Sequence, residues 1–180
     1  MARAGDTIEN PRTGQRMRFL QTGAETNGEL LQIECVSPPH GAPEPVHVHP
    51  RQEHRFEVLD GALRFEVGGQ QTDVRAGDAA FFVPPGAPHR FGNPGEVDAR
   101  YLQEFRPALH IDGFFETLFA LARDGKLDAK GSPGLLQVAV LVPEHRDEIR
   151  LVSPPWPVVR VMSALLGPVA RLLGYRPDYR

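Results

Sequence analysis

Short runs of residues that alternate between apolar and polar side chains fill most of the first hundred residues. Such alternation places the apolar side chains on one face of a half-buried strand. Gly, Pro, Asn and Asp, which are typical of turns, separate the runs. The pattern predicts strands over residues 17–22, 29–36, 55–59, 62–69, 71–75, 79–83, 89–93 and 98–105. Many short strands joined by turns indicate a small antiparallel barrel or sandwich.

The pattern changes after Arg106 and Pro107. Apolar residues then recur at helical spacing between Phe114 and Ala122, with Asp112 as the expected N-cap and Gly125 as the expected C-cap. The apolar run 135–142 fits a strand or a helix equally well. We therefore expect an N-terminal arm over residues 1–16, a β-barrel over 17–106 and a helical extension over 107–180.

The C-terminal run 156–175 has two different faces when it is placed on a helix. One face carries arginine and small residues: Arg160, Ser163, Ala164, Gly167, Arg171 and Gly174. The other face is apolar: Val159, Val161, Met162, Leu165, Leu166, Val169, Leu172 and Leu173. Pro168 is expected to kink or divide this helix.

The apolar face of this helix needs a partner. The uncharged stretch between Arg160 and Arg171 is ten residues long, whereas a membrane span takes about 20. Two alternatives remain: the face covers the barrel or a partner subunit, or it lies on a membrane surface. With only two arginines on the opposite face, we favour packing against the barrel or within a homodimer.

Composition narrows the class of protein. A chain of 180 residues with 41% hydrophobic residues suits one domain. A formal net charge of −3 gives no basic character, so no nucleic-acid partner is expected. Cys35, the single cysteine, lies in an apolar run, where we expect a buried core residue. Without a disulfide, and with no apolar signal-peptide stretch near the N-terminus, the chain is expected in the cytoplasm.

Two stretches carry the histidines from which a metal site could be built. His47 and His49 are one residue apart, so both side chains should project from the same face of a strand. Glu53 and His54 follow a few residues later, and His89 comes after a turn rich in Pro and Gly. Imidazole and carboxylate groups are common metal ligands, so these residues predict a metal site.

These stretches resemble the two motifs of the cupin superfamily, G-x5-H-x-H-x(3,4)-E-x6-G and G-x5-P-x-G-x2-H-x3-N. Gly41, His47, His49 and Gly61 fit the first motif, and Pro84, Gly86, His89 and Asn93 fit the second. The resemblance implies a mainly-β fold, a single cupin barrel of the double-stranded β-helix or jelly-roll type, followed here by C-terminal helices. It also implies one divalent transition metal.

The sequence departs from these motifs at two places. Counted back from Gly61, the position of the motif glutamate is occupied by His54, while Glu53 stands one residue early. Six residues rather than five separate Gly77 from Pro84, which predicts a bulge in that strand.

Strand parity decides between the two residues of the first departure. With His54 inward, Phe56 and Val58 also face the core and Arg55 faces solvent, whereas the opposite parity would bury charged side chains. Parity therefore predicts a ligand set of His47, His49, His54 and His89, with Glu53 as the alternative to His54. The same alternation predicts a pocket lined by Phe56, Val58, Phe65 and Phe91.

The resemblance to the cupins also suggests a function. Its members hold iron, manganese, nickel, copper or zinc, and the sequence does not select among these metals. The leading hypothesis is a metal-dependent dioxygenase-type oxidoreductase that acts on a small, aromatic or enolic substrate. An isomerase or lyase that uses the metal as a Lewis acid is one alternative. A noncatalytic barrel that binds a sugar or another small molecule, with or without metal, is another.

Overall fold

The computed structural model describes residues 2–39, 44–128 and 131–179; Gly41 of the first motif lies outside them. The strands are β1 (Thr7–Glu9), β2 (Arg16–Gln21), β3 (Leu31–Ser37), β4 (His47–Val48), β5 (Glu53–Asp60), β6 (Ala62–Val67), β7 (Gln70–Arg75), β8 (Phe81–Val83), β9 (His89–Gly92), β10 (Ala99–Arg106) and β11 (Arg150–Leu151). The helices are α1 (Ile111–Arg123), α2 (Leu135–Glu144) and α3 (Trp156–Leu172).

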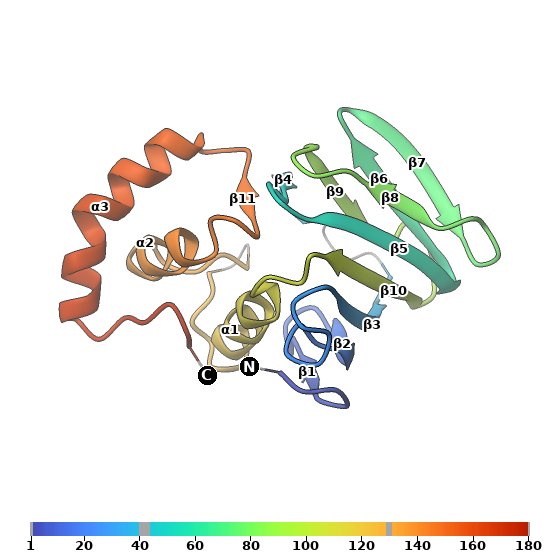
Figure 1. Ribbon diagram of the computed structural model, residues 1–180, viewed down its shortest axis with the longest axis horizontal. Helices are drawn as coiled ribbons and strands as arrows, with labels where there is room; N and C mark the ends of the chain where they lie inside the picture. The colour runs from blue at the N-terminus through green and yellow to red at the C-terminus, as the bar shows by residue number, and fades with distance from the viewer. Residues whose placement is uncertain (1, 40–43, 129–130, 180) are drawn as a thin grey trace.

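The strands form two sheets (Figure 1). One has the order β1-β2-β3-β10-β5-β8, and the other has the order β11-β4-β9-β6-β7. The apolar side chains of both sheets share one core, whose largest fully buried members include Phe19, Phe56, Phe65, Tyr101 and Phe105. The mainly-β architecture followed by helices is the one expected from the sequence.

Strand β5 has the predicted parity. His54, Phe56 and Val58 are buried, whereas the residues between them are partly exposed on the other face of the sheet. On that face the Arg55 guanidinium pairs with Glu57 at 2.7 Å and with Glu104 at 3.4 Å. The charged side chains that the opposite parity would have turned into the core therefore have partners on the other face of the sheet.

The N-terminal segment is part of a sheet, although its polar composition suggested a loosely held arm. Strand β1 pairs antiparallel with β2, from Thr7 opposite Arg18 to Glu9 opposite Arg16. Ala2 is buried against the core. Strand pairing uses backbone N–H and C=O groups, so a polar segment can join a sheet edge without contributing apolar side chains.

The bulge predicted between Gly77 and Pro84 is absent from the pairing of β8 with β5. Phe81, Phe82 and Val83 lie opposite Phe56, Arg55 and His54 without a shift of register. The extra residue instead falls in the turn before β8, where Gly77 has a φ of +91°. Glycine adopts this conformation at little cost, so the turn can absorb the extra residue and leave the strand regular.

The helices begin and end near the predicted residues. His110, not Asp112, is the N-cap of α1, and Asp112 lies in the first turn, where its negative charge faces the positive end of the helix dipole. Gly125 follows the helix with a φ of +67°, as expected of a terminating glycine. The ambiguous run 135–142 is helical and forms most of α2.

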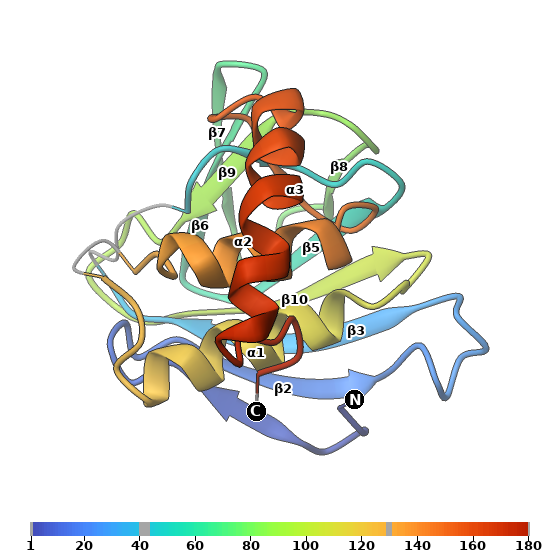
Figure 2. The same ribbon diagram turned by 90° about the vertical axis from the view of Figure 1, so that its left-hand side faces the viewer.

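Helix α3 reverses the packing predicted for its two faces. It lies at the far side of the molecule from the sheets and packs on α2 (Figures 1 and 2). Its small residues Ser163, Gly167 and Ala170 are buried, whereas Val161, Leu165 and Leu172 are 62%, 70% and 87% exposed. Small side chains let two helix backbones approach closely, and the face that carries them is the one that packs on α2. The apolar face therefore does not pack on the barrel of the same chain, and its packing on a partner subunit stays a prediction.

Pro168 does not divide α3, which runs from Trp156 to Leu172. The proline removes a single backbone hydrogen bond, while Gly167 and Ala170 on either side of it stay packed within the helix pair. Among the helices that the structure describes, none is both long and apolar enough to cross a membrane.

Candidate metal centre

Three buried histidines meet between the two sheets. His47 lies on β4, His49 follows that strand, and His89 begins β9. Strands β4 and β9 pair so that His47 lies directly opposite His89. Each histidine offers one ring nitrogen to a group whose atoms all lie within 4.8 Å of one another, which is close enough to hold one metal ion.

Backbone carbonyls fix the orientation of all three rings. The Nδ1 atoms of His47, His49 and His89 lie 3.0, 2.6 and 2.9 Å from the carbonyl oxygens of Pro45, Glu148 and Ala87. A carbonyl oxygen only accepts, so each Nδ1 carries the proton and each Nε2 is left with a lone pair.

The Nε2 atoms meet the requirement of a metal site. Those of His49 and His89 are buried, and neither has a hydrogen-bond partner in the part of the chain that the structure describes. Metal-binding histidines commonly donate the other ring N–H to a carbonyl or carboxylate, the arrangement found here. The donor set therefore fits a divalent transition metal.

The C-terminal extension completes this centre. Strand β11 pairs with β4, with Leu151 opposite His47, and the Val152 N–H donates to the Val46 carbonyl at 3.1 Å. This pairing brings the Glu148 carbonyl to His49, 99 residues earlier in the chain. The extension is thus part of the site.

Burial keeps the histidines neutral. Burial lowers the pKa of His47 to about 4. Repulsion from a charged His89 lowers this pKa further, whereas the hydrogen bond to Pro45 raises it. Burial likewise lowers the pKa of His49 well below its usual value, and that of His89 to a smaller degree. Neutral imidazole is the form that binds metal ions, so the triad is ready to bind at neutral pH.

His54 lies beside the triad without belonging to the group of three. Its ring centroid is 4.9 Å from that of His49 and 4.0 Å from that of Phe105. Its Nε2 is hydrogen-bonded to Oε1 of Gln103 at 3.1 Å, and its Nδ1 is buried without a partner among the described residues. Glu53 lies on the opposite face of β5. A role for His54 as fourth ligand stays a prediction.

A cavity of about 290 Å³ adjoins the histidines. His47, His49 and His54 line it, together with aromatic residues from both the sheets and α1: Phe91, Phe105, Phe114, Phe115 and Phe119. Of the four residues expected to line the pocket, Phe91 does so. Phe56, Val58 and Phe65 are packed in the core, where the rings of Phe56 and Phe65 lie 4.7 Å apart. The cavity is lined instead by aromatic side chains of α1. Strand parity could not predict these, because they lie on a helix.

Sequence reasoning missed two participants in this site. Glu44 lines the cavity, and burial raises the pKa of its carboxyl to about 7. Glu44 stands three residues before His47, in a proline-rich segment that leads into the strand. Its closeness to the histidines could therefore have been predicted from the sequence. Glu148 had no such signal, because it contributes a backbone carbonyl that any residue possesses.

Comparison with known proteins agrees with this description. The chain is 26% identical over 147 residues to "Probable oxidoreductase virH" of Hypocrea virens, covering 75% of this chain and 65% of that protein. It is 30% identical over 78 residues to quercetin 2,3-dioxygenase of Bacillus subtilis, covering 43% of this chain and 23% of the enzyme. The chain therefore spans less than two thirds of the length of either relative.

A solved structure shows the same fold. The structure of a predicted oxalate decarboxylase from Thermotoga maritima superposes with a TM-score of 0.51 at 22% identity, covering 59% of this chain and 98% of that one. Residues 34–103 match the Cupin_2 model, described as a cupin domain. The chain therefore carries a domain of the cupin superfamily, with a buried histidine triad that could hold a metal ion.

Proposed function

We propose that this protein is a metal-dependent dioxygenase-type oxidoreductase that acts on a small aromatic or enolic substrate. The observation that carries the proposal is the convergence of His47, His49 and His89, each with Nδ1 held by a backbone carbonyl and Nε2 left for a metal. The names of the two relatives, an oxidoreductase and a dioxygenase, support the reaction class.

The aromatic wall of the cavity supports the substrate class. Phe91, Phe105 and Phe115 line the cavity together with the histidines, and aromatic surfaces pack favourably against a flat, apolar substrate. The same side chains exclude water from the reacting atoms. A bound iron, manganese, nickel, copper or zinc ion would polarise the substrate, and a redox-active one would also allow reaction with O2.

Glu44 would act as the general base in this reaction. A carboxyl group with a pKa near 7 exists in both protonation states at neutral pH, which suits a general base. We infer that its carboxylate accepts the proton of a substrate hydroxyl, so that the substrate reacts as an anion. Within the described residues, no carboxylate belongs to the histidine group itself, which leaves Glu44 as the acidic side chain that lines the cavity.

Oxygen uptake tests the proposal. Metal-loaded protein is supplied with quercetin and with simple aromatic enols and catechols as probes, and consumption of O2 and of each probe is followed together. A dioxygenase consumes one O2 per substrate molecule without an added reductant, because both oxygen atoms enter the product. His89→Ala should abolish uptake, while Arg18→Gln, an exposed change on β2, should leave it unchanged. Turnover without O2 uptake would contradict the dioxygenase and favour an isomerase or lyase.

A further inference from the structure

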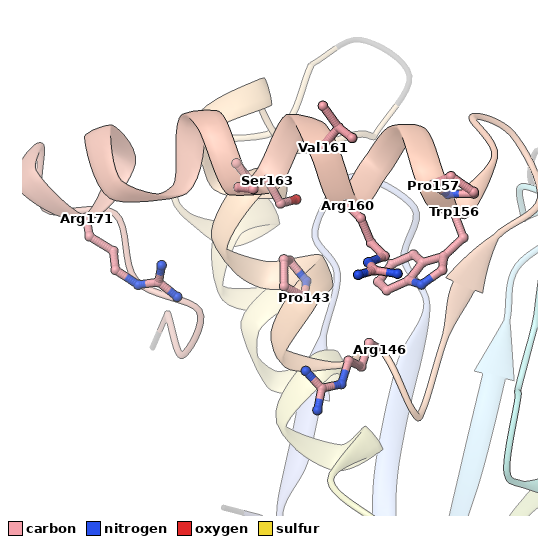
Figure 3. Close-up of a pocket in the computed structure, with 10 residues that line it drawn as sticks. Pro143, Arg146, Trp156, Pro157, Arg160, Val161, Ser163 and Arg171 are labelled. Atoms are coloured by element: carbon pink, nitrogen blue, oxygen red, sulfur yellow. The ribbon is translucent and has the colours of Figure 1, made fainter.

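A second pocket lies away from the cupin cavity, in the groove between α2 and α3 (Figure 3). Its volume is about 540 Å³, within the range of pockets that take small organic ligands. Apolar and small side chains form much of its wall: Ala139, Pro143, Trp156, Pro157, Val161 and Ala164. The metal centre makes no use of this groove.

Three arginines line the groove: Arg146 after α2, and Arg160 and Arg171 on α3. Figure 3 shows the Arg146 and Arg160 guanidinium groups on the side of the groove where Trp156 lies, and Arg171 toward the other end. No carboxylate side chain is among the residues that line it. Within residues 2–39, 44–128 and 131–179, none of the three arginines forms an ion pair. A cluster of arginines that is not neutralised by nearby carboxylates attracts anions, so the groove has the charge of an anion-binding site.

A buried hydroxyl group also lies in the wall of the groove. Ser163 is 8% exposed and lines the groove, and its Oγ has no hydrogen-bond partner among the described residues. A buried hydroxyl left unpaired costs free energy. This Oγ is closed off from solvent, so the arginines and Trp156 are the polar and aromatic groups of the groove that a ligand can contact.

The groove is fixed in shape at both ends. Arg150 stacks over the Trp156 ring, 4.7 Å from its centroid, and donates from Nε to the Arg146 carbonyl at 2.7 Å. At the other end Arg171 lies beside Gly167, where an added Cβ would be 3.4 Å from its Nη1. Arg146, Arg160 and Arg171 are themselves exposed, so a ligand can reach their guanidinium groups from solvent.

From these observations we propose that the α2–α3 groove binds a small aromatic carboxylate. The planar guanidinium groups of Arg146 and Arg160 match a carboxylate, to which arginine can donate two parallel hydrogen bonds. Trp156 and the apolar wall accept the ring that carries it. The site is separate from the metal centre, so binding there does not depend on the proposed oxygenase reaction.

Trp156 provides the test, since it is the only tryptophan in the chain. Benzoate is titrated into the full-length protein at low ionic strength, and Trp156 emission is recorded. Benzamide serves as the neutral probe of the same shape. We expect a saturable change with benzoate and none with benzamide. Arg160→Gln should raise the Kd at least tenfold, and changing Arg146 and Arg160 together to Gln should abolish the response.

Two controls separate this groove from other sites. Arg18→Gln should bind benzoate as wild type does, and so should His89→Ala, which removes a histidine of the metal centre. An equal response to benzamide, an unchanged Kd in the arginine variants or no saturable response would overturn the proposal. Anionic phospholipid vesicles that shift Trp156 emission when benzoate does not would overturn it too, and would assign α3 to a membrane surface.

Discussion

The Nδ1 of His49 lies 2.6 Å from the carbonyl oxygen of Glu148, a residue 99 positions later in the chain. This contact ties the orientation of a histidine in the cupin domain to a segment that lies beyond the matched residues 34–103. The geometry of the candidate metal centre therefore depends on both parts of the chain.

Weakening the pairing of β11 with β4 should weaken metal binding. Val152→Pro removes the N–H that donates to Val46 and should loosen the segment that presents the Glu148 carbonyl. Loss of such an outer partner typically lowers metal affinity about 10- to 100-fold. Competition with a chelator measures the change. Val152→Ala keeps the N–H and should bind metal as wild type does; equal losses in the two variants would show that the side chain matters and the pairing does not.

His54 and Glu53 should respond differently to substitution. His54 faces the cavity and Glu53 faces the other side of β5. His54→Ala should therefore lower metal affinity, while Glu53→Ala should leave it within about twofold, since the Glu53 side chain lies on the face of β5 that points away from the cavity. Metal content and chelator competition measure both variants. The reverse ranking would show that Glu53 reaches the metal.

Much of this arrangement could be predicted from the sequence, because it follows local rules. The alternation in β5 placed His54, Phe56 and Val58 on one face, and the spacing of His47 and His49 placed both rings in the site. What escaped prediction depends on contacts between distant segments. The Glu148 carbonyl reaches His49 only through β11, and α3 buries Ser163 and Gly167 because α2 lies against them. Helical periodicity identifies the two faces of a helix, but it does not show which face packs against another element.

Glu44 should make stability depend on pH in a defined direction. Its folded pKa of about 7 lies above the usual value of 4.5, so the folded state holds the proton more tightly than the unfolded state. This contribution is fully present below pH 4.5 and is lost as pH rises through 7. Relative to wild type, metal-free Glu44→Gln should therefore gain stability between these limits. Urea unfolding at several pH values measures the difference, and a constant difference would contradict the raised pKa.

Gly61, the last glycine of the first motif, should resist substitution for two reasons. Its φ is +74°, and an added Cβ would lie 2.9 Å from the carbonyl oxygen of Asp98. Gly68 has a φ of +56° but open space around it. Gly68→Ala should cost about 1–2 kcal/mol from conformation alone, and Gly61→Ala should cost more in urea unfolding. Equal costs would show that the backbone near Asp98 moves aside freely.

Elemental analysis tests the central claim most directly. The protein is purified without an affinity tag or chelator, and metal is counted per chain in wild type, His89→Ala and Arg18→Gln. The account predicts near one equivalent of a divalent transition metal in wild type and Arg18→Gln, and almost none in His89→Ala. Absence of metal from wild type, together with failure to bind any on reconstitution, would contradict the histidine metal centre.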